Sequence, residues 1–461
     1  MSLPMRHSSK VRQPQLPQQL QHVHLHAAGI DIGSESHWVA VPEGSDQQPV
    51  REFGAFTGHL QQLADWLAAC GIQTVVMEST GVYWIPLFEL LEERGLEVLL
   101  VDPRHLKSVP GRKTDVLDCQ WLQRLHTFGL LSGAFRPAEE IAALRGYLRH
   151  RSMLVSTAAQ HIQHMQKAMQ QMNVRLEKVL SDITGLTGLR IIDAINSGER
   201  RPSELAKLRD PRCQHPEELI AAALEGHWRP EHLFALRQAR ALYGVYQQQI
   251  AECDQEVEKC LASLPDQTGG EPLPQTGRVK AKHRSAPAFD VRSSLYRAVG
   301  RDLTRVNGLD EQSALLLIGE IGMDMSRWPS AKHFASWLCL CPGNRVSGGK
   351  KSSSRTRPST NKAREILRQA VNGLHHSQSA LGAYLRRMKA KLGGPAGITA
   401  AAHKLAKLVY HILKDRWLFT DPGADAYEAQ YRDRVVTSLM RKAKDFGYSL
   451  VQTSTQAPAQ N

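Results

Sequence analysis

The pattern of apolar residues changes at about residue 137, and this change limits the folds that are open to the chain. Before it, short apolar runs such as Ala28–Val41, Gln73–Glu78 and Glu97–Val101 alternate with segments of helical periodicity, which is typical of an α/β sheet with crossover helices. After it, the chain consists mainly of long helical runs, including Ile141–Leu180 and His232–Leu264. We therefore expect an α/β domain followed by helices.

The two long runs are each sufficient for a helical hairpin or a coiled coil, and the sequence leaves open whether they form a spacer or a dimerisation element. A stretch rich in Gly, Pro and Lys follows at 266–290 and predicts a flexible linker. Further on, Val306–Gly322 has a glycine turn between apolar segments and resembles a helix-hairpin-helix, whose backbone N–H groups can hold a phosphate. A turn that serves only packing would have the same pattern.

The charge of the chain indicates a polyanionic partner. Among its 461 residues, 58 Lys and Arg stand against 45 Asp and Glu, which gives a formal net charge of +13. No run of 18 apolar residues occurs, so we expect no membrane span, and the opening segment lacks the apolar core of a signal peptide, which predicts a cytoplasmic protein. The seven cysteines form no Cys-x-x-Cys pair and are expected to be reduced thiols.

Four carboxylates have the spacing of metal ligands. Asp31 lies within the apolar strand GIDIG and Glu78 ends the apolar strand TVVME, where an unpaired charge is costly unless the strand end faces solvent or a cation. Asp115 and Asp118 are three residues apart on a predicted helix and share one face. Together the four predict a site for divalent cations, with Mg²⁺ as the best candidate. Asp115 and Asp118 alone would more often be an N-cap and a solvated residue of a helix face.

A basic segment with a candidate nucleophile lies in the second half of the chain. Residues 345–364 carry seven Lys and Arg and no acid, and their Gly and Ser content predicts a loop that contacts phosphates. Ser347 precedes two glycines, but no His or Asp motif nearby completes a triad, so chemistry alone does not separate it from other serines of the loop. A loop that only raises solubility is the alternative. The predicted nucleic-acid contacts are Arg345, Lys350, Lys351, Arg355, Arg357 and Lys362.

Three blocks, GIDIGSESHWVAV, VVMESTGVYW and GRKTDVLDCQWL, closely resemble the motifs of the DEDD-type insertion-sequence transposases, whose first domain is similar to the RuvC resolvase. The resemblance assigns Asp31, Glu78, Asp115 and Asp118 to the DEDD tetrad. FASWLCLCPGNRVSGGKK and STNKAREILRQAV resemble the second conserved domain of the same family, in which the serine of the Ser-Gly step is the nucleophile. Ser347 is the matching residue.

The resemblance implies a DNA recombinase that excises and inserts its own element under the guidance of a bridge RNA. Its partners would be donor DNA, target DNA, the bridge RNA and further copies of the chain in a dimer or tetramer. Ser347 would form a phosphoserine intermediate, and Mg²⁺ would bind the tetrad. A Holliday-junction or structure-specific endonuclease would need the tetrad alone. A non-catalytic nucleic-acid-binding protein would explain the charge but gives Asp31 and Glu78 no role.

The expected fold class is α/β plus α. The segments are a disordered arm (1–24), a RuvC/ribonuclease-H-like domain (25–136), a helical coiled-coil region (137–265), a flexible linker (266–290), a mainly helical C-terminal transposase domain with the helix-hairpin-helix-like segment and Ser347 (291–425), and a polar tail (426–461).

Overall fold

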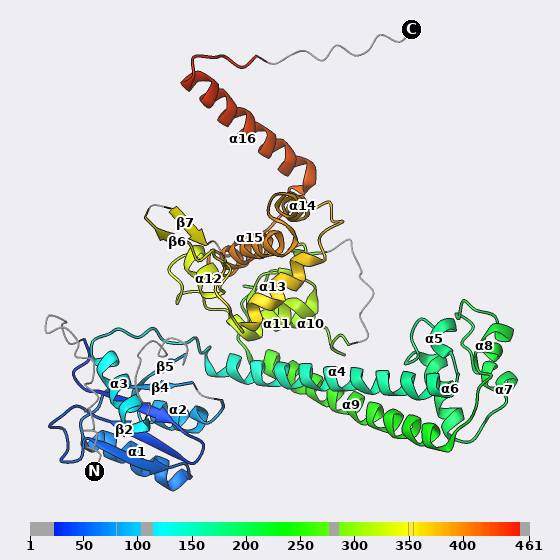
Figure 1. Cartoon of the computed structure of the whole chain (residues 1–461), viewed down its shortest axis with the longest axis horizontal. Coiled ribbons are helices and arrows are strands. Elements are labelled where there is room, and N and C mark those ends of the chain that lie inside the picture. The colour runs from blue at the N-terminus through cyan, green and yellow to red at the C-terminus, as the bar shows by residue number, and fades with distance from the viewer. Residues whose placement is uncertain are drawn as a thin grey trace, which may run out of the picture. The chain divides into compact units, whose positions relative to one another are not determined.

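The structure is a computed structural model that describes residues 23–79, 81–102, 114–275, 285–348, 350–353 and 355–451. Arg112 and Lys113, just before Asp115, and most of the N-terminal arm lie outside these ranges. The chain divides into two compact units, Met1–Arg136 and Pro137–Asn461 (Figure 1). Each unit is described by itself.

The first unit contains a five-stranded mixed sheet in the order β3-β2-β1-β4-β5. The first three strands pair antiparallel, while β4 and β5 continue the sheet parallel to β1. This mixed α/β architecture is compatible with the predicted RuvC/ribonuclease-H-like domain. The strands are β1 (Ala27–Ile32), β2 (Ser36–Ala40), β3 (Val50–Gly54), β4 (Thr74–Glu78) and β5 (Glu97–Val101).

Helices cover both faces of this sheet. On one face, α1 (Thr57–Ala69) and α2 (Trp84–Glu93) pack on a core that includes Ile30 and Met77. On the other face lies α3 (Asp115–Thr127), whose Leu122 packs against Val76. This layering follows from the alternation of side chains along a strand. The predicted runs Gln73–Glu78 and Glu97–Val101 form β4 and β5, with helices between the strands as expected. The run Ala28–Val41 divides into β1 and β2, and β3 was not predicted.

The second unit begins with two long antiparallel helices, α4 (Glu139–Gln171) and α9 (Pro230–Ser263) (Figure 1). A buried ion pair between Arg151 and Asp254 joins them. The predicted helical hairpin therefore forms, but α4 ends at Gln171 instead of continuing to Leu180. A cap of short helices shares an apolar core with the far ends of α4 and α9. The cap consists of α5 (Leu176–Val179), α6 (Leu186–Asn196), α7 (Pro202–Ala206) and α8 (Glu217–Ala223).

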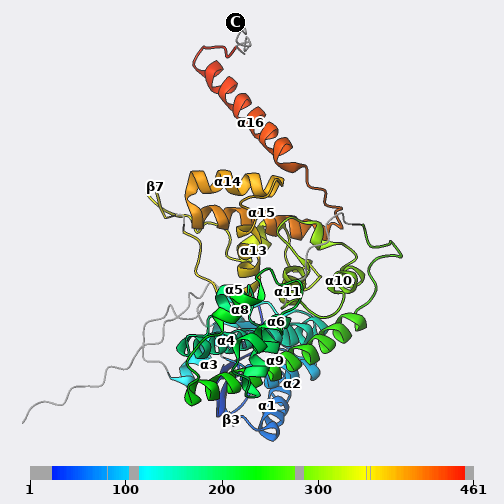
Figure 2. The ribbon, with the colours of Figure 1, turned by 90° about the vertical axis from the view of Figure 1, so that its right-hand side faces the viewer.

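The rest of the second unit is mainly helical. Arg145 ties α11 to α4 by donating to the carbonyl oxygens of Gly319 and Glu320 at 3.0 and 2.6 Å. Figure 2 shows α14 and α15 as a layer from which α16 projects. The elements are α10 (Val291–Val299), a 3₁₀ turn η2 (Leu303–Arg305), α11 (Glu311–Ile321), α12 (Ala331–Trp337), β6 (Arg345–Ser347), β7 (Lys350–Ser353), α13 (Lys362–Asn372), α14 (Ala380–Leu392), α15 (Gly394–Lys414) and α16 (Gly423–Asp445).

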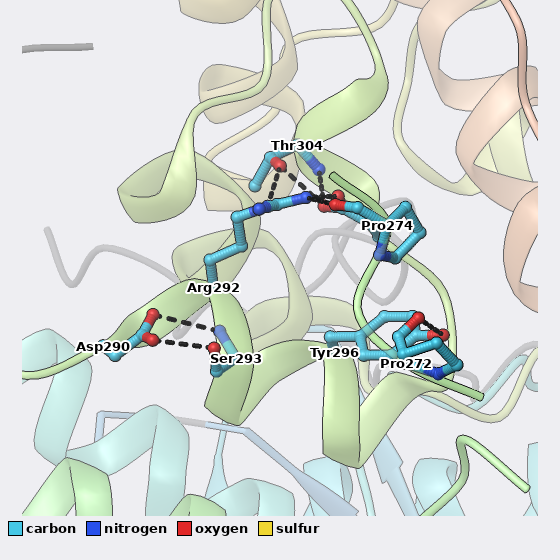
Figure 3. A network of polar contacts seen from close by, with 8 residues as sticks. Pro272, Pro274, Asp290, Arg292, Ser293, Tyr296 and Thr304 are labelled. Carbon is cyan, nitrogen blue, oxygen red and sulfur yellow. Dashed lines mark hydrogen bonds and ion pairs between the residues drawn. The ribbon is translucent and has the colours of Figure 1, made fainter. Parts of the chain in front are cut away.

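The expected linker and the expected polar tail both differ from their predictions. Residues 266–275 of the expected linker form no helix or strand, yet they are bonded to α10: Arg292 donates to the Pro274 carbonyl at 2.6 Å and the Tyr296 hydroxyl to that of Pro272 at 3.3 Å (Figure 3). The long helix α16 starts at Gly423, before the expected polar tail, and includes the tail's residues up to Asp445. The helix shows that polar composition alone does not make a segment irregular. Residues 276–284 of the expected linker lie outside the described ranges.

The glycine turn of the predicted helix-hairpin-helix forms at Gly308, but only one helix, α11, lies within Val306–Gly322. A Cβ atom at Gly308 would lie 2.8 Å from the carbonyl oxygen of Ala370 on α13. The glycine therefore allows α13 to pack closely against the turn, as the packing alternative requires. Its contact with a phosphate stays a prediction.

Among the described residues, no helix is both long and apolar enough to cross a bilayer. All seven cysteines are free thiols, as predicted.

Candidate active site

Asp31 and Glu78 lie next to each other at the carboxyl ends of two neighbouring strands. Strands β1 and β4 are parallel, and their register pairs Gly29 with Val76 and Ile30 with Met77. One step further along both strands come Asp31 and Glu78, and each is half-buried. The register of the sheet therefore brings together two acids that are far apart in the sequence.

Both carboxylates belong to the sheet face that α3 covers. Gly29 and Asp31 are two residues apart and so share one face. A Cβ atom at Gly29 would overlap the backbone of Cys119 and Gln123 in α3, which shows how closely this helix crosses β1. In the same way Glu78 shares a face with Val76, which packs against α3.

The direction of α3 brings its first turn to the same edge of the sheet. At its C-terminal end, His126 Nε2 lies 2.9 Å from Thr74 Oγ1, at the start of β4. The helix therefore runs opposite to β4, and Asp115 and Asp118 in its first turn lie towards the carboxyl ends of the strands. Asp115 is exposed and Asp118 is half-buried.

Charge and hydrogen bonds support this arrangement. Thr114 is the N-cap of α3, and its side chain accepts a hydrogen bond from the Leu117 amide at 3.3 Å. Acids in the first helical turn are stabilised by the positive end of the helix dipole. Burial first, and then the nearby carboxylate of Asp31, raises the pKa of Cys119 to about 12. Cys119 is consequently a neutral thiol packed beside the acids.

The donor set suits a hard divalent cation. Carboxylate oxygens are the ligands that Mg²⁺ prefers, and the two strand ends and the first turn of α3 supply four of them at one edge of the sheet. In the arrangement seen, no three His, Cys, Asp or Glu side chains of the described ranges form a group that could hold a metal ion. The residues therefore fit a metal in donor type and in the placement of their elements, without a formed set of ligands.

Ser347 lies on a β-hairpin, where the sequence predicted an irregular loop. Strands β6 and β7 pair antiparallel, with Arg345 opposite Ser353 and Ser347 opposite Lys350. Gly348 follows Ser347 with a φ of +54°, a left-handed conformation that glycine adopts at little cost. Ser347 is thus the last residue of β6 before the turn, at the tip of the hairpin.

The structure also places Ser347 apart from two other serines of the basic segment, Ser353 and Ser359, whereas Ser352 belongs to β7 of the same hairpin. Ser353 belongs to the opposite end of the hairpin, next to Arg345. Ser359 lies beyond the hairpin, and its hydroxyl accepts a hydrogen bond from the Asn361 amide at 3.1 Å. Ser354 lies outside the described residues. The hairpin tip therefore presents Ser347 differently from Ser353 and Ser359.

The basic residues predicted to contact nucleic acid lie on this hairpin and just after it. Arg345, Lys350 and Lys351 belong to its two strands. Arg355 and Arg357 are exposed and follow β7, and Lys362 is the first residue of α13.

Sequence reasoning did not single out Arg364 of α13, which supports the base of the hairpin. It donates to Thr356 Oγ1 at 3.3 Å and to the Arg357 carbonyl at 3.4 Å. A bridge between Pro342 and Thr356 and a hydrogen bond from the Gly343 amide to the Arg355 carbonyl at 3.0 Å close the same base. The sequence feature that could have indicated Arg364 is its position as the last of the seven Lys and Arg residues in 345–364.

Two models of transposase families match the chain. A model of DEDD transposases of the IS110 type, described as "Transposase", matches residues 28–174 and so includes all four carboxylates. A second, described as "Transposase IS116/IS110/IS902 family", matches residues 300–386 and includes the hairpin with Ser347. The two matches together cover about half of the chain. A search among curated proteins gave no match.

Proposed function

Since the chain belongs to the IS110 family of DEDD transposases, we propose that it cleaves and rejoins DNA with two sets of residues: the carboxylates Asp31, Glu78, Asp115 and Asp118, and the nucleophile Ser347. Family membership supports a DNA transposase as the general activity. The observation that most supports the first set is the register of β1 and β4, which brings Asp31 beside Glu78 on the face that α3 covers.

The four acids are proposed to hold Mg²⁺, which would neutralise the charge of the scissile phosphate and stabilise the leaving oxygen. The arrangement of the chain supports this. Like charges at one edge of a sheet repel each other unless a cation compensates them. The two strands hold Asp31 and Glu78 in a fixed register, while α3 adds acids from a separate element.

The proposed reaction of Ser347 is a transesterification. Its Oγ attacks the phosphorus of a DNA phosphodiester, the bond to one sugar oxygen breaks, the serine hydroxyl loses its proton and the departing sugar oxygen gains one. The phosphoserine diester keeps the energy of the broken bond, so a sugar hydroxyl of another strand can attack it, restore the serine and rejoin DNA without a nucleotide cofactor. A position at the tip of a hairpin suits a nucleophile that must reach a DNA backbone.

We further propose donor DNA, target DNA and a bridge RNA as partners, and a homodimer or homotetramer as the active form. These proposals rest on the family. The basic hairpin supports the nucleic-acid part, because Lys and Arg side chains gain affinity by releasing counterions from phosphates.

Replacing one acid of the tetrad tests this function. Asp31→Asn or Asp118→Asn should lower strand cleavage about a hundredfold or more, since one ligand and one negative charge are lost, whereas DNA binding should hold because the basic surface is unchanged. Cleavage of end-labelled DNA in Mg²⁺, with the RNA that copurifies with the protein, measures the first effect, and a gel-shift titration the second.

Asp65→Asn is the matched control, since Asp65 is an exposed acid of α1 that forms a surface ion pair with Arg94 at 2.8 Å. It should cleave at the wild-type rate. Full cleavage by both tetrad variants would remove the carboxylates from the reaction.

A further inference from the structure

The positive charge of the chain is concentrated in one stretch of the second unit. Residues 325–414 contain 17 Lys and Arg and a single acid, Glu365, although the whole chain has a net charge of only +13. The hairpin accounts for part of this excess. Much of the remainder lies on α14 and α15, outside the candidate active site.

Two cations of this stretch and one cation of α16 come together where α14, α15 and α16 meet. They are Arg387 of α14, Lys404 of α15 and Arg434 of α16. The pKa of Lys404 is lowered, mainly by burial and further by the charges of Arg434 and Arg387, while Asp421 acts in the opposite direction. Asp421 is itself engaged, because its Oδ1 accepts a hydrogen bond from the Ala380 amide at 3.1 Å.

Tyrosine rings line this cluster. Lys404 Nζ lies 4.6 Å from the centre of the Tyr384 ring and 4.8 Å from that of Tyr427. Arg387 Cζ lies 4.6 Å from the Tyr427 ring and 3.4 Å from the Tyr431 ring. Such cation–π contacts orient the cations but offset only part of their mutual repulsion. Arg387 Nη1 is in addition buried without a hydrogen-bond partner among the described residues.

The cations also differ in their exposure. Arg387 and Lys404 are half-buried, whereas Arg434 is exposed on α16 and donates from Nε to the Gln430 carbonyl of its own helix at 3.1 Å. The arrangement is therefore a pair of fixed cations with an exposed third one at the rim. An anion that reaches the rim would relieve the repulsion among all three.

We propose that Arg387, Lys404 and Arg434 bind a phosphate of the DNA backbone at the junction of α14, α15 and α16, a second DNA contact separate from the hairpin. The proposal rests on the transposase function, which makes DNA the polyanion at hand. A phosphate provides a negative charge and several acceptor oxygens, and exposed Tyr431 extends the site with an aromatic face.

Arg434→Gln tests the site without disturbing its packing, because the side chain is exposed and donates its hydrogen bond to the carbonyl of Gln430 in its own helix. With the full-length protein and a duplex DNA probe, we expect affinity about tenfold weaker at low salt and a salt slope of log K shallower by about 0.9, the value of one lost phosphate contact. Arg434→Lys should retain most of the affinity.

Arg441→Gln is the matched control. Arg441 lies seven residues further along α16, which is about two helical turns and the same face, and it is also exposed. It removes the same charge at a distance from the cluster and should bind DNA as the wild type does.

A second variant, Lys404→Gln, probes the half-buried part, with thermal unfolding as the check on folding. A folded Lys404→Gln protein with the same loss supports the site. Three results would each overturn the proposal. Arg434→Gln could bind DNA with wild-type affinity and salt slope, or Arg441→Gln could lose as much affinity as Arg434→Gln. The third is a loss of affinity for a single-stranded RNA probe but not for duplex DNA. Because the measurement is binding and not strand cleavage, its failure leaves the proposed function to its own test.

Discussion

Single residues fix the position of α3, and His126 is the most informative of them. Its ring is buried, lies 2.9 Å from the Thr74 hydroxyl and stacks on His24 with ring centres 4.7 Å apart. Burial first, and then the charge of His24, lowers the pKa of His126 to about 4. At neutral pH the imidazole is therefore uncharged and holds the C-terminal end of α3 against the start of β4.

This histidine predicts a loss of stability in mild acid. Between pH 6.5 and 4 the unfolded chain takes up a proton at His126 that the folded chain does not. The free energy of unfolding therefore decreases as the pH is lowered, by up to about 3 kcal/mol. Urea unfolding at pH 7 and pH 4.5 should show a smaller pH effect in His126→Gln than in the wild type. Some effect remains, because burial also lowers the pKa of His37.

His59→Gln, at an exposed position of α1, is the control and should keep the wild-type pH effect. An unchanged pH effect in His126→Gln would show that another group is responsible.

Among the elements, α3 depends on a glycine of β1. A Cβ atom at Gly29 would overlap the α3 backbone, so Gly29→Ala should push the helix away from the sheet, lower the free energy of unfolding by about 3 kcal/mol and reduce strand cleavage. Gly58→Ala, in α1 with no atom within 4 Å of the added methyl, should leave cleavage unchanged and raise stability by up to about 1 kcal/mol. Equal stability and cleavage in the two variants would contradict the close crossing of α3.

Some elements of the fold and some residues of the candidate site could be recognised from the sequence. The apolar runs of the first unit that became β1, β4 and β5 could be recognised from the sequence, and Asp31 and Glu78 stand out because each is a lone acid in an apolar strand. Strand β3 was missed because its sequence, VREFG, is charged at its centre and is not buried. The hairpin of Ser347 was missed because both of its strands, RVS and KKSS, are mainly polar and have no apolar alternation. The two glycines between Ser347 and Lys350 were the available signal, since they suit a two-residue hairpin turn.

The junction of α14, α15 and α16 could not be foreseen, for a different reason. Arg387, Lys404 and Arg434 are separated by long stretches of sequence, and only the packing of three helices brings them together. Likewise, the register between β1 and β4 arises from a crossover connection, which local patterns do not specify.

For the molecule as a whole, the proposed chemistry is divided between the two compact units. The carboxylates belong to the first unit and Ser347 to the second. One transposase model covers the carboxylates and extends into the second unit, to residue 174, and the other covers Ser347. The excess positive charge also lies in the second unit. The central claim is therefore that a serine of the second unit, and not water, attacks the DNA.

Trapping the covalent intermediate tests this claim most directly. Full-length protein, incubated with its copurified RNA and a nicked DNA substrate, should accumulate a protein–DNA adduct that survives denaturation and maps to the peptide of Ser347. Ser347→Ala should lose the adduct and recombination on the order of 10⁶-fold, whereas Ser353→Ala, at the other end of the same hairpin, should keep both. Free cleaved ends without an adduct, together with full activity of Ser347→Ala, would contradict the account and favour a hydrolytic, RuvC-like nuclease.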